Sequence, residues 1–218
     1  YDGSIGSSGS VAVTGLATGD SVSGSSQTFA SKNVLGTSGS TLQVNSGYTV
    51  NDGNSGANYS VTTNTAQGSI TQAALSLSAV TGSKVYDGST SASGSVAVSG
   101  LATGDSVTST SQAFASKNVL GTSGSTLNVA GYTVNDGNSG LNYAVTTNSA
   151  SGTITRLTSV TWIGSASGNW FDAANWQGGA VPDLANVANV FIPAGISVNF
   201  NNSNPSSTAQ AGLVQVRS

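Results

Sequence analysis

Tyr86-Asp87-Gly88-Ser89 opens the second copy of a long repeat, whose first copy opens with Tyr1-Asp2-Gly3-Ser4. Residues 86–129 are identical to residues 1–44 at 35 of 44 positions. After a deletion of one residue, the match continues with 19 identities over the 24 positions of residues 48–71. A repeat of about 85 residues is too long for the rung of a solenoid and has the size of a small β-sandwich module.

Apolar residues within each copy predict short β-strands. In the first copy, alternating or β-branched bursts occur at residues 10–13, 41–44, 48–50, 58–62 and 69–71. Turn residues such as Gly19-Asp20 and Asp52-Gly53 separate these bursts. No stretch spaces its apolar residues at helical intervals over two turns. We therefore predict an all-β fold, in which residues 1–72 and residues 73–157 each form an immunoglobulin-like β-sandwich.

A further strand is predicted at residues 74–80, where Ala-Leu-Ser-Leu-Ser-Ala-Val alternates ahead of Lys84-Val85-Tyr86. The first copy begins directly at Tyr1 and has no equivalent of this strand. If the strand belongs to the sandwich, the first copy is missing an edge, and the exposed neighbour is a candidate for pairing with another chain. The sequence also opens without a Met or a leader, so we expect it to be part of a longer protein.

The composition excludes several kinds of chemistry. The chain has 5 Lys and Arg and 8 acidic residues, all of them Asp, and it has no His, Cys or Met. Nucleophilic catalysis with a histidine base, thiol chemistry and zinc sites of Cys or His are therefore excluded. Five scattered basic residues do not form a nucleic-acid surface, and no run of about 18 apolar residues is present to span a membrane. Because the Asp residues lie in turns, we expect no enzymatic activity.

The same composition still allows a folded chain. Ser, Thr and Gly make up 94 of the 218 residues, whereas Val, Ile, Leu and Phe make up 46. This apolar share is just above the level at which disorder becomes the default, and a net charge of −3 is too small to favour disorder. We expect thin cores and polar turns. The lack of Cys would suit a bacterial protein that crosses an outer membrane unfolded.

Three motifs of the second copy resemble a known family. They are Lys84-Val85-Tyr86-Asp87-Gly88, Gly140-Leu141-Asn142-Tyr143 and Gly152-Thr153-Ile154-Thr155. Together they resemble the YDG repeat, which occurs in tandem in large filamentous-haemagglutinin-type adhesins of Gram-negative bacteria, typically exported by two-partner secretion. The resemblance covers residues 1–156, although the first copy lacks the Lys-x-Tyr lead. It implies a non-enzymatic spacer or adhesin segment that is extracellular, lies at the bacterial cell surface and serves cell adhesion or biofilm formation.

Residues 158–218 differ in composition from both copies. All three Trp residues lie here, in Trp162-Ile163-Gly164, Gly168-Asn169-Trp170 and Asn175-Trp176, followed by Val181-Pro182. This run resembles a segment found beside right-handed β-helices, or capping them, in bacterial surface proteins. The resemblance implies that residues 158–218 form the start of a β-solenoid (β-helix) or its cap.

The Trp residues are the first candidate ligand site. Exposed rings of Trp162, Trp170 and Trp176 would form a platform that stacks on the sugar rings of a polysaccharide. The alternative is that the three rings form the core of a small domain that has few other large apolar residues.

Two copies of Asp-Gly-Asn-Ser-Gly form the second candidate site. Asp52 and Asn54 in the first copy, and Asp136 and Asn138 in the second, offer oxygen ligands at alternate positions, as in part of a calcium loop. No acidic residue closes the loop as in an EF-hand, and these residue types are also ordinary turn formers. Calcium is therefore the one cofactor that the sequence suggests, with a simple turn as the alternative.

Charged and aromatic residues also recur between the copies. Equivalent positions are occupied by Lys32 and Lys117, by Asp20 and Asp105, and by Tyr59 and Tyr143. We expect the Lys residues to be solvated, with a structural ion pair or an isopeptide cross-link as the alternatives. We expect the Tyr residues to anchor a sandwich corner through ring burial and a hydroxyl hydrogen bond.

Three functions agree with the sequence. The first is a non-enzymatic stalk in a secreted bacterial adhesin, which presents adhesive regions for attachment to cells, matrix or host. The second is a carbohydrate-binding module, whose Trp segment contacts an exopolysaccharide or a host glycan. The third is a filament subunit that self-associates by strand exchange at the unpaired edge of the first copy.

Overall fold

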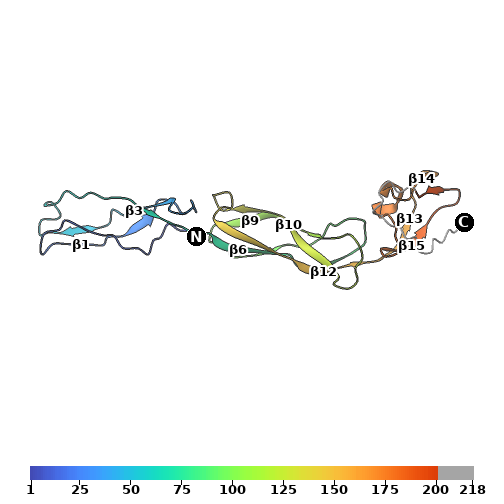
Figure 1. Ribbon diagram of the computed structural model, residues 1–218, viewed down its shortest axis with the longest axis horizontal. Coiled ribbons are helices and arrows are strands. Elements are labelled where there is room, and N and C mark those ends of the chain that lie inside the picture. The colour runs from blue at the N-terminus through green and yellow to red at the C-terminus, as the bar shows by residue number, and fades with distance from the viewer. Residues whose placement is uncertain (201–218) are drawn as a thin grey trace. The chain divides into compact units, whose positions relative to one another are not determined.

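The computed structural model describes residues 1–200, and Figure 1 shows its strands. The chain divides into two compact units. Unit 1 consists of Tyr1–Ser76, Val98–Thr108 and Thr133–Thr146, and unit 2 consists of Leu77–Ala97, Ser109–Tyr132 and the residues from Thr147 onward. We call residues 1–72 repeat 1 and residues 73–157 repeat 2. Because repeat 2 contributes to both units, the units follow contacts in space and do not test the predicted boundaries.

The predicted all-β fold is confirmed. The strands of repeat 1 are β1 (Ser21–Ser23), β2 (Gln27–Phe29), β3 (Ser40–Val44), β4 (Thr49–Asn51) and β5 (Ala66–Gly68). Those of repeat 2 are β6 (Ala73–Ser78), β7 (Gly82–Val85), β8 (Ala97–Ser99), β9 (Ser106–Phe114), β10 (Ser125–Asn135), β11 (Tyr143–Asn148) and β12 (Ala150–Thr155). The residues after repeat 2, together with Leu157, are called the C-terminal segment. It contains β13 (Leu157–Thr161), β14 (Ser167–Asn169), β15 (Val187–Phe191) and β16 (Ser197–Asn199), with two 3-10 turns, η1 (Ala173–Asn175) and η2 (Gln177–Gly179). Within residues 1–200, no helix is long and apolar enough to cross a membrane.

Strand β6 is the central strand of one of the two sheets in repeat 2. That sheet has the order β11-β6-β8, and the other has the order β7-β12-β10-β9. The alternation predicted for residues 74–80 is observed, because Leu75 and Leu77 are 1% and 0% exposed and the Ser residue after each is partly exposed. Because both neighbouring strands pair with β6, this strand fills the core and also holds its sheet together.

Repeat 1 has no counterpart of β6, and it forms less sheet. Its strands make a two-stranded sheet, β1-β4, and a three-stranded sheet, β2-β3-β5. Residues 12–14 and 59–64, which are equivalent to β8 and β11, form no strand. Ser40 is the only buried residue among residues 1–72, all of which the structure describes. Because the two repeats are nearly identical in sequence, the missing central strand accounts for this difference.

The core of unit 2 continues from repeat 2 into the C-terminal segment. Tyr86, Phe114, Leu127 and Ile154 of repeat 2 belong to one buried cluster with residues of the C-terminal segment. The members from the C-terminal segment are Val160, Trp162, Trp170, Trp176, Ala180, Val187, Val190 and Ile192. The C-terminal segment therefore shares its core with repeat 2.

Two parallel strand pairs organise the C-terminal segment. β13 pairs with β15, which places Val160 opposite Val190, and β14 pairs with β16. Parallel pairing between segments distant in sequence agrees with the start of a β-solenoid, which stays a prediction. Residues 201–218 of the predicted segment lie outside the described residues.

Replacing Leu77 with Ala tests the role of β6. Leu77 is fully buried, so Leu77→Ala should lower the free energy of unfolding by about 2–5 kcal/mol through lost burial and a cavity. Chemical denaturation followed by circular dichroism measures the loss. Leu120 is 54% exposed, so Leu120→Ala is the control and should change stability by less than about 0.5 kcal/mol. Equal effects of the two substitutions would contradict a central role for β6.

Candidate interface between successive repeats

The loop that contains the second Asp-Gly-Asn-Ser-Gly motif closes around the carboxylate of Asp136. Oδ1 of Asp136 accepts the backbone N–H of Asn138 and that of Gly140, both at 2.8 Å, and Oδ2 accepts the N–H of Asn142 at 3.1 Å. Gly140 has a φ of 81°, a left-handed conformation that glycine adopts without strain. The loop thus presents Asn142 in a fixed orientation.

The equivalent loop of repeat 1 is built in the same way. The carboxylate of Asp52 accepts the N–H groups of Asn54 and Gly56 at 2.8 Å and that of Asn58 at 3.1 Å. These hydrogen bonds, first that from Gly56, hold the pKa of the Asp52 carboxyl below its ordinary value. Burial would raise the pKa of Asp136, but hydrogen bonds from the backbone N–H groups of Gly140, Asn138 and Asn142 outweigh burial and lower that pKa.

This geometry accounts for the four residues that the sequence analysis offered as calcium ligands. The carboxylates of Asp52 and Asp136 are engaged by their own loops, and the side-chain amides of Asn54 and Asn138 donate to Asn58 and Asn142 at 3.0 and 2.9 Å. Across the described residues, no group of three or more acidic, His or Cys side chains gathers to hold a metal ion. These hydrogen bonds agree with the turn interpretation of all four residues, and calcium binding at them stays a prediction.

Asn142 joins repeat 2 to repeat 1 within unit 1. Its Oδ1 accepts the backbone N–H of Val34 at 2.8 Å, and its Nδ2 donates to the Oδ1 of Asn33 at 3.2 Å. Asn138 adds a hydrogen bond from its Nδ2 to the carbonyl of Val34 at 3.2 Å. Since Asn142 is 0% exposed, these hydrogen bonds are formed away from water. The loop at residues 32–34, Lys-Asn-Val, is therefore hydrogen-bonded to two asparagines of the next repeat.

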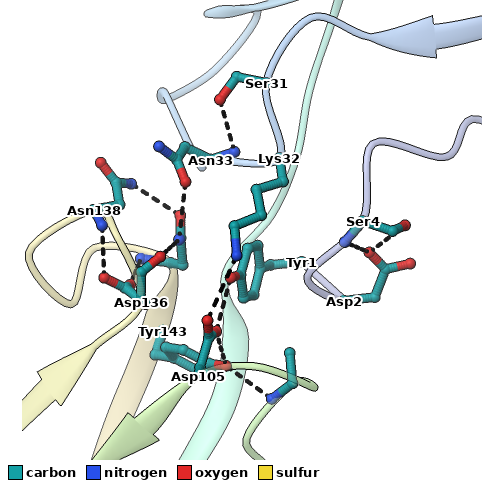
Figure 2. A network of polar contacts seen from close by, with 12 residues as sticks. Tyr1, Asp2, Ser4, Ser31, Lys32, Asn33, Asp105, Asp136, Asn138 and Tyr143 are labelled. Carbon is teal, nitrogen blue, oxygen red and sulfur yellow. Dashed lines mark hydrogen bonds and ion pairs between the residues drawn. The ribbon is translucent and has the colours of Figure 1, made fainter.

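A second set of contacts in unit 1 centres on Asp105 (Figure 2). The hydroxyls of Tyr1 and Tyr143 both donate to Oδ2 of Asp105, at 2.7 and 2.6 Å. The ammonium of Lys32 lies 3.5 Å from Oδ1 of Asp105, whose side chain is 3% exposed, and 5.8 Å from the centre of the Tyr1 ring. Tyr1 and Lys32 come from repeat 1, and Asp105 and Tyr143 come from repeat 2. The ion-pair alternative for Lys32 is thus observed.

The ring burial and the hydroxyl hydrogen bond that were predicted for Tyr143 are observed. Its ring is 3% exposed and meets the Tyr1 ring edge-on, with centres 5.4 Å apart. Its hydroxyl donates to Asp105 and accepts the N–H of Ala102 at 2.8 Å. Burial, and then the hydrogen bond to Asp105, raise the pKa of Tyr143 to about 12. Tyr59 of repeat 1 makes the corresponding bond to Asp20 at 2.6 Å, but Tyr59 is only partly buried, so the burial predicted for it is not observed.

A junction of the same kind joins repeat 2 to the C-terminal segment within unit 2. Oδ1 of Asn186 accepts the N–H of Val119 at 2.7 Å, and its Nδ2 donates to Oδ1 of Asn118 at 3.2 Å. Asn118 and Val119 are the repeat 2 equivalents of Asn33 and Val34. Asn186 is 1% exposed, and its N–H is held by Oδ1 of Asp183 at 2.9 Å. The Lys-Asn-Val loop of each repeat therefore docks on a buried asparagine of the element that follows.

The first Tyr of each repeat takes part in the same junctions. Tyr86 is 2% exposed, and its hydroxyl donates to the carbonyl of Val181 at 3.1 Å, whereas the hydroxyl of Tyr1 donates to Asp105. Burial, and then the negative charges of Asp183 and Asp87, raise the pKa of Tyr86 to about 12. The Tyr-Asp-Gly motif thus supplies a junction residue in both repeats.

The three Trp rings are buried in a core, as the second of the two alternatives predicted, and do not form an exposed platform. Trp162, Trp170 and Trp176 are 2%, 2% and 1% exposed. The ring of Trp176 meets those of Trp162 and Trp170 edge-on, at 5.1 and 4.8 Å between centres. Each indole N–H donates to a backbone carbonyl, those of Ser165, Pro182 and Trp170. Because a stacking platform needs an exposed ring face, the described structure corrects the expectation of a sugar site at these residues.

The junction asparagines were not candidates in the sequence analysis. Asn142 and Asn186 lie in polar loops where an asparagine is an ordinary turn residue, and their partners are about a hundred or about seventy positions away. One signal was present, because Lys-Asn-Val recurs at residues 32–34 and 117–119. Near-identical repeats preserve almost every residue, so that recurrence did not stand out.

The strands and junctions define an all-β protein in which each module contacts the one that follows. Residues 71–150 match the family model described as the YDG domain. The match starts just before β6, so the matched stretch includes this strand. Searches among curated proteins and among solved structures gave no match.

Asn142→Ala tests the first junction, and Asn58→Ala is the matched control. Asn58 has the same hydrogen bonds within its own loop, but it is exposed and no Lys-Asn-Val loop docks on it. Asn142→Ala leaves the buried N–H of Val34 without an acceptor, which should cost about 1–3 kcal/mol, and the control should cost less. Hydrogen exchange at the Val34 amide is the specific readout. Unchanged protection of Val34 in Asn142→Ala would contradict the junction.

The raised pKa values of Tyr86 and Tyr143 predict alkaline unfolding. Both hydroxyls have an ordinary pKa of 10.0 and a folded pKa of about 12, so the folded chain holds these protons more tightly. This contribution to stability is complete below pH 10 and is lost as the pH rises towards 12. Denaturation across this range, with tyrosinate absorbance, measures the loss. Tyr86→Phe and Tyr143→Phe should each flatten the decline, and an unchanged decline in both variants would contradict the assignment.

Proposed function

We propose that this chain is a non-enzymatic stalk segment of a secreted bacterial surface adhesin. The observation that carries the proposal is the recurrence of one junction, in which a Lys-Asn-Val loop docks on a buried asparagine at both ends of repeat 2. A contact that passes from each module to the next is suited to building an extended series of modules. Such a series would present adhesive regions at a distance from the cell surface.

Repeat 1 contains the equivalents of two residues with which repeat 2 binds the preceding repeat: Asn58 corresponds to Asn142, and Asp20 corresponds to Asp105. Asn58 is exposed and held by Asp52 as Asn142 is held by Asp136. Asp20 accepts the hydroxyl of Tyr59. Within the described residues, no second tyrosine or lysine approaches Asp20 as Tyr1 and Lys32 approach Asp105. In a stalk, a preceding YDG module would supply these groups.

The finer architecture belongs to the same proposal. The two sheets of repeat 2, with buried Leu75 and Leu77, support an immunoglobulin-like sandwich for each repeat. The parallel pairs β13–β15 and β14–β16 support the start of a β-solenoid in the C-terminal segment. Few charges and no Cys support export to the cell surface by two-partner secretion. The buried Trp rings give the carbohydrate-binding alternative no support.

Attachment of cells under flow tests the stalk. Cells that produce the protein with Asn142→Ala and Asn186→Ala should detach at lower shear than wild-type cells, because each junction loses its central hydrogen bonds. Cells with Asn58→Ala are the matched control for a substitution that opens no junction in this chain. Antibody labelling of intact cells must show equal amounts of each variant at the surface.

Three outcomes would contradict this function. Absence of antibody labelling on intact cells would contradict the surface location. Equal detachment of the junction variants and the wild type would contradict the stalk. Binding of the isolated chain to a panel of exopolysaccharides and host glycans, lost on truncation at Leu157, would instead favour the carbohydrate-binding alternative.

A further inference from the structure

Repeat 1 contains an open groove of about 560 Å³. Residues 10–16 and 59–66 line the groove, together with Val22, Val44 and Val50. Val13 and Val61, which both line it, are 44% and 50% exposed. Apolar side chains that stay exposed together in one groove indicate a surface that another segment can cover.

The groove lies where repeat 2 has its central strand. In repeat 2, β6 lies between β8 and β11 in the sheet order β11-β6-β8. The repeat 1 equivalents of these two flanking strands are residues 12–14 and 59–64, which line the groove and form no strand. The groove therefore lies at the position in repeat 1 that corresponds to the position of β6 in repeat 2.

A pair of equivalent glycines supports this placement. A Cβ atom on Gly100 of repeat 2 would lie 2.3 Å from the carbonyl oxygen of Ala74, because β6 passes directly against it. A Cβ atom on Gly15, the equivalent residue of repeat 1, would meet nothing within 4 Å. Repeat 1 thus keeps the glycine that lets a strand approach, without the strand.

A glutamine side chain supplies the second piece of evidence. Gln112 in repeat 2 is 4% exposed and grips the backbone just after β6: its Oε1 accepts the N–H of Val80 at 2.8 Å, and its Nε2 donates to the Val80 carbonyl at 3.0 Å. Gln27, the equivalent residue of repeat 1, lines the groove, and its Nε2 donates only to the hydroxyl of Ser7, at 3.3 Å. Gln27 is therefore placed to hold the backbone of an incoming strand by the same two hydrogen bonds.

We propose that the groove of repeat 1 is an acceptor site for an extended strand of the β6 type, the leading strand of a YDG module. The strand would carry leucines two positions apart, as Leu75 and Leu77 do, because alternate side chains of a strand point to the same face. Its backbone would pair with residues 12–14 and 59–64 and be held by Gln27. The groove would accept such a strand whether or not the chain belongs to an adhesin.

A synthetic peptide with the sequence of residues 73–85 is the probe, used with the full chain. It should bind with one-to-one stoichiometry in fluorescence anisotropy. On binding, the amides of residues 12–14 and 59–64 should become protected from hydrogen exchange. A peptide in which both leucines are replaced by Asn should bind at least about tenfold more weakly, since its apolar anchors are lost.

Two variants of the chain locate the binding site. Val13→Asp places a charge in the groove and should abolish binding of the peptide, and Gln27→Ala should weaken it about tenfold through loss of its backbone hydrogen bonds. Leu35→Asp is the control, because Leu35 is 51% exposed and does not line the groove. Unchanged amide protection of Leu77 shows that repeat 2 remains folded in each variant.

Several results would overturn the proposal. They are the absence of peptide binding to the unmodified chain, binding that survives Val13→Asp, and binding that leaves residues 12–14 and 59–64 unprotected. A concentration-dependent dimer that protects the groove without peptide would also overturn it, since the occupant would then be a second copy of this chain. Failure of the stalk in the flow experiment would leave the peptide result unchanged, so the two proposals can fail separately.

Discussion

The junctions of this chain depend on a hydrogen bond from a backbone N–H to a buried asparagine side chain. Asn142 and Asn186 are 0% and 1% exposed, and each accepts the N–H of a valine in a Lys-Asn-Val loop. A buried polar group without a partner costs about 1–3 kcal/mol, so such a contact is stable only in the right geometry. A chain with few charges can obtain specificity between modules in this way, in addition to the apolar core that repeat 2 shares with the C-terminal segment.

The two repeats also show how far a strand depends on its partner. Ala12-Val13-Thr14 and Ala97-Val98-Ser99 are nearly the same sequence, yet only the second forms a strand, β8, beside β6. Residues 59–64 and β11 differ in the same way. Local β-propensity is equal in each pair, so pairing with the central strand decides the outcome. The same dependence explains why repeat 1 buries only Ser40, although it keeps the valines of its second copy.

Sequence alone was sufficient for features that depend on local patterns. The all-β fold followed from alternating apolar residues, the absent strand of repeat 1 followed from comparison of the copies, and the burial of Tyr143 followed from its place in Asn-Tyr. The role of Asn142 did not follow, because its partner Val34 is about a hundred residues away and only the folded chain brings them together. Trp162, Trp170 and Trp176 left two alternatives open, since a ring that packs and a ring that binds sugar look the same in sequence. Burial decided between them.

The second junction shows what the Lys-Asn-Val loop recognises. Asn142 is held by Asp136 six positions earlier, in a loop with two glycines, whereas Asn186 is held by Asp183 three positions earlier, in a loop without glycine. Both asparagines nevertheless accept the valine N–H, and both offer their own carbonyl to the first residue of the strand leading the next element, Ala73 or Leu157, at 3.0 and 2.9 Å. The loop therefore recognises a presented asparagine rather than a particular sequence around it. For this reason the Lys-Asn-Val loop of repeat 2 can dock on an element that differs in sequence from the one on which the loop of repeat 1 docks.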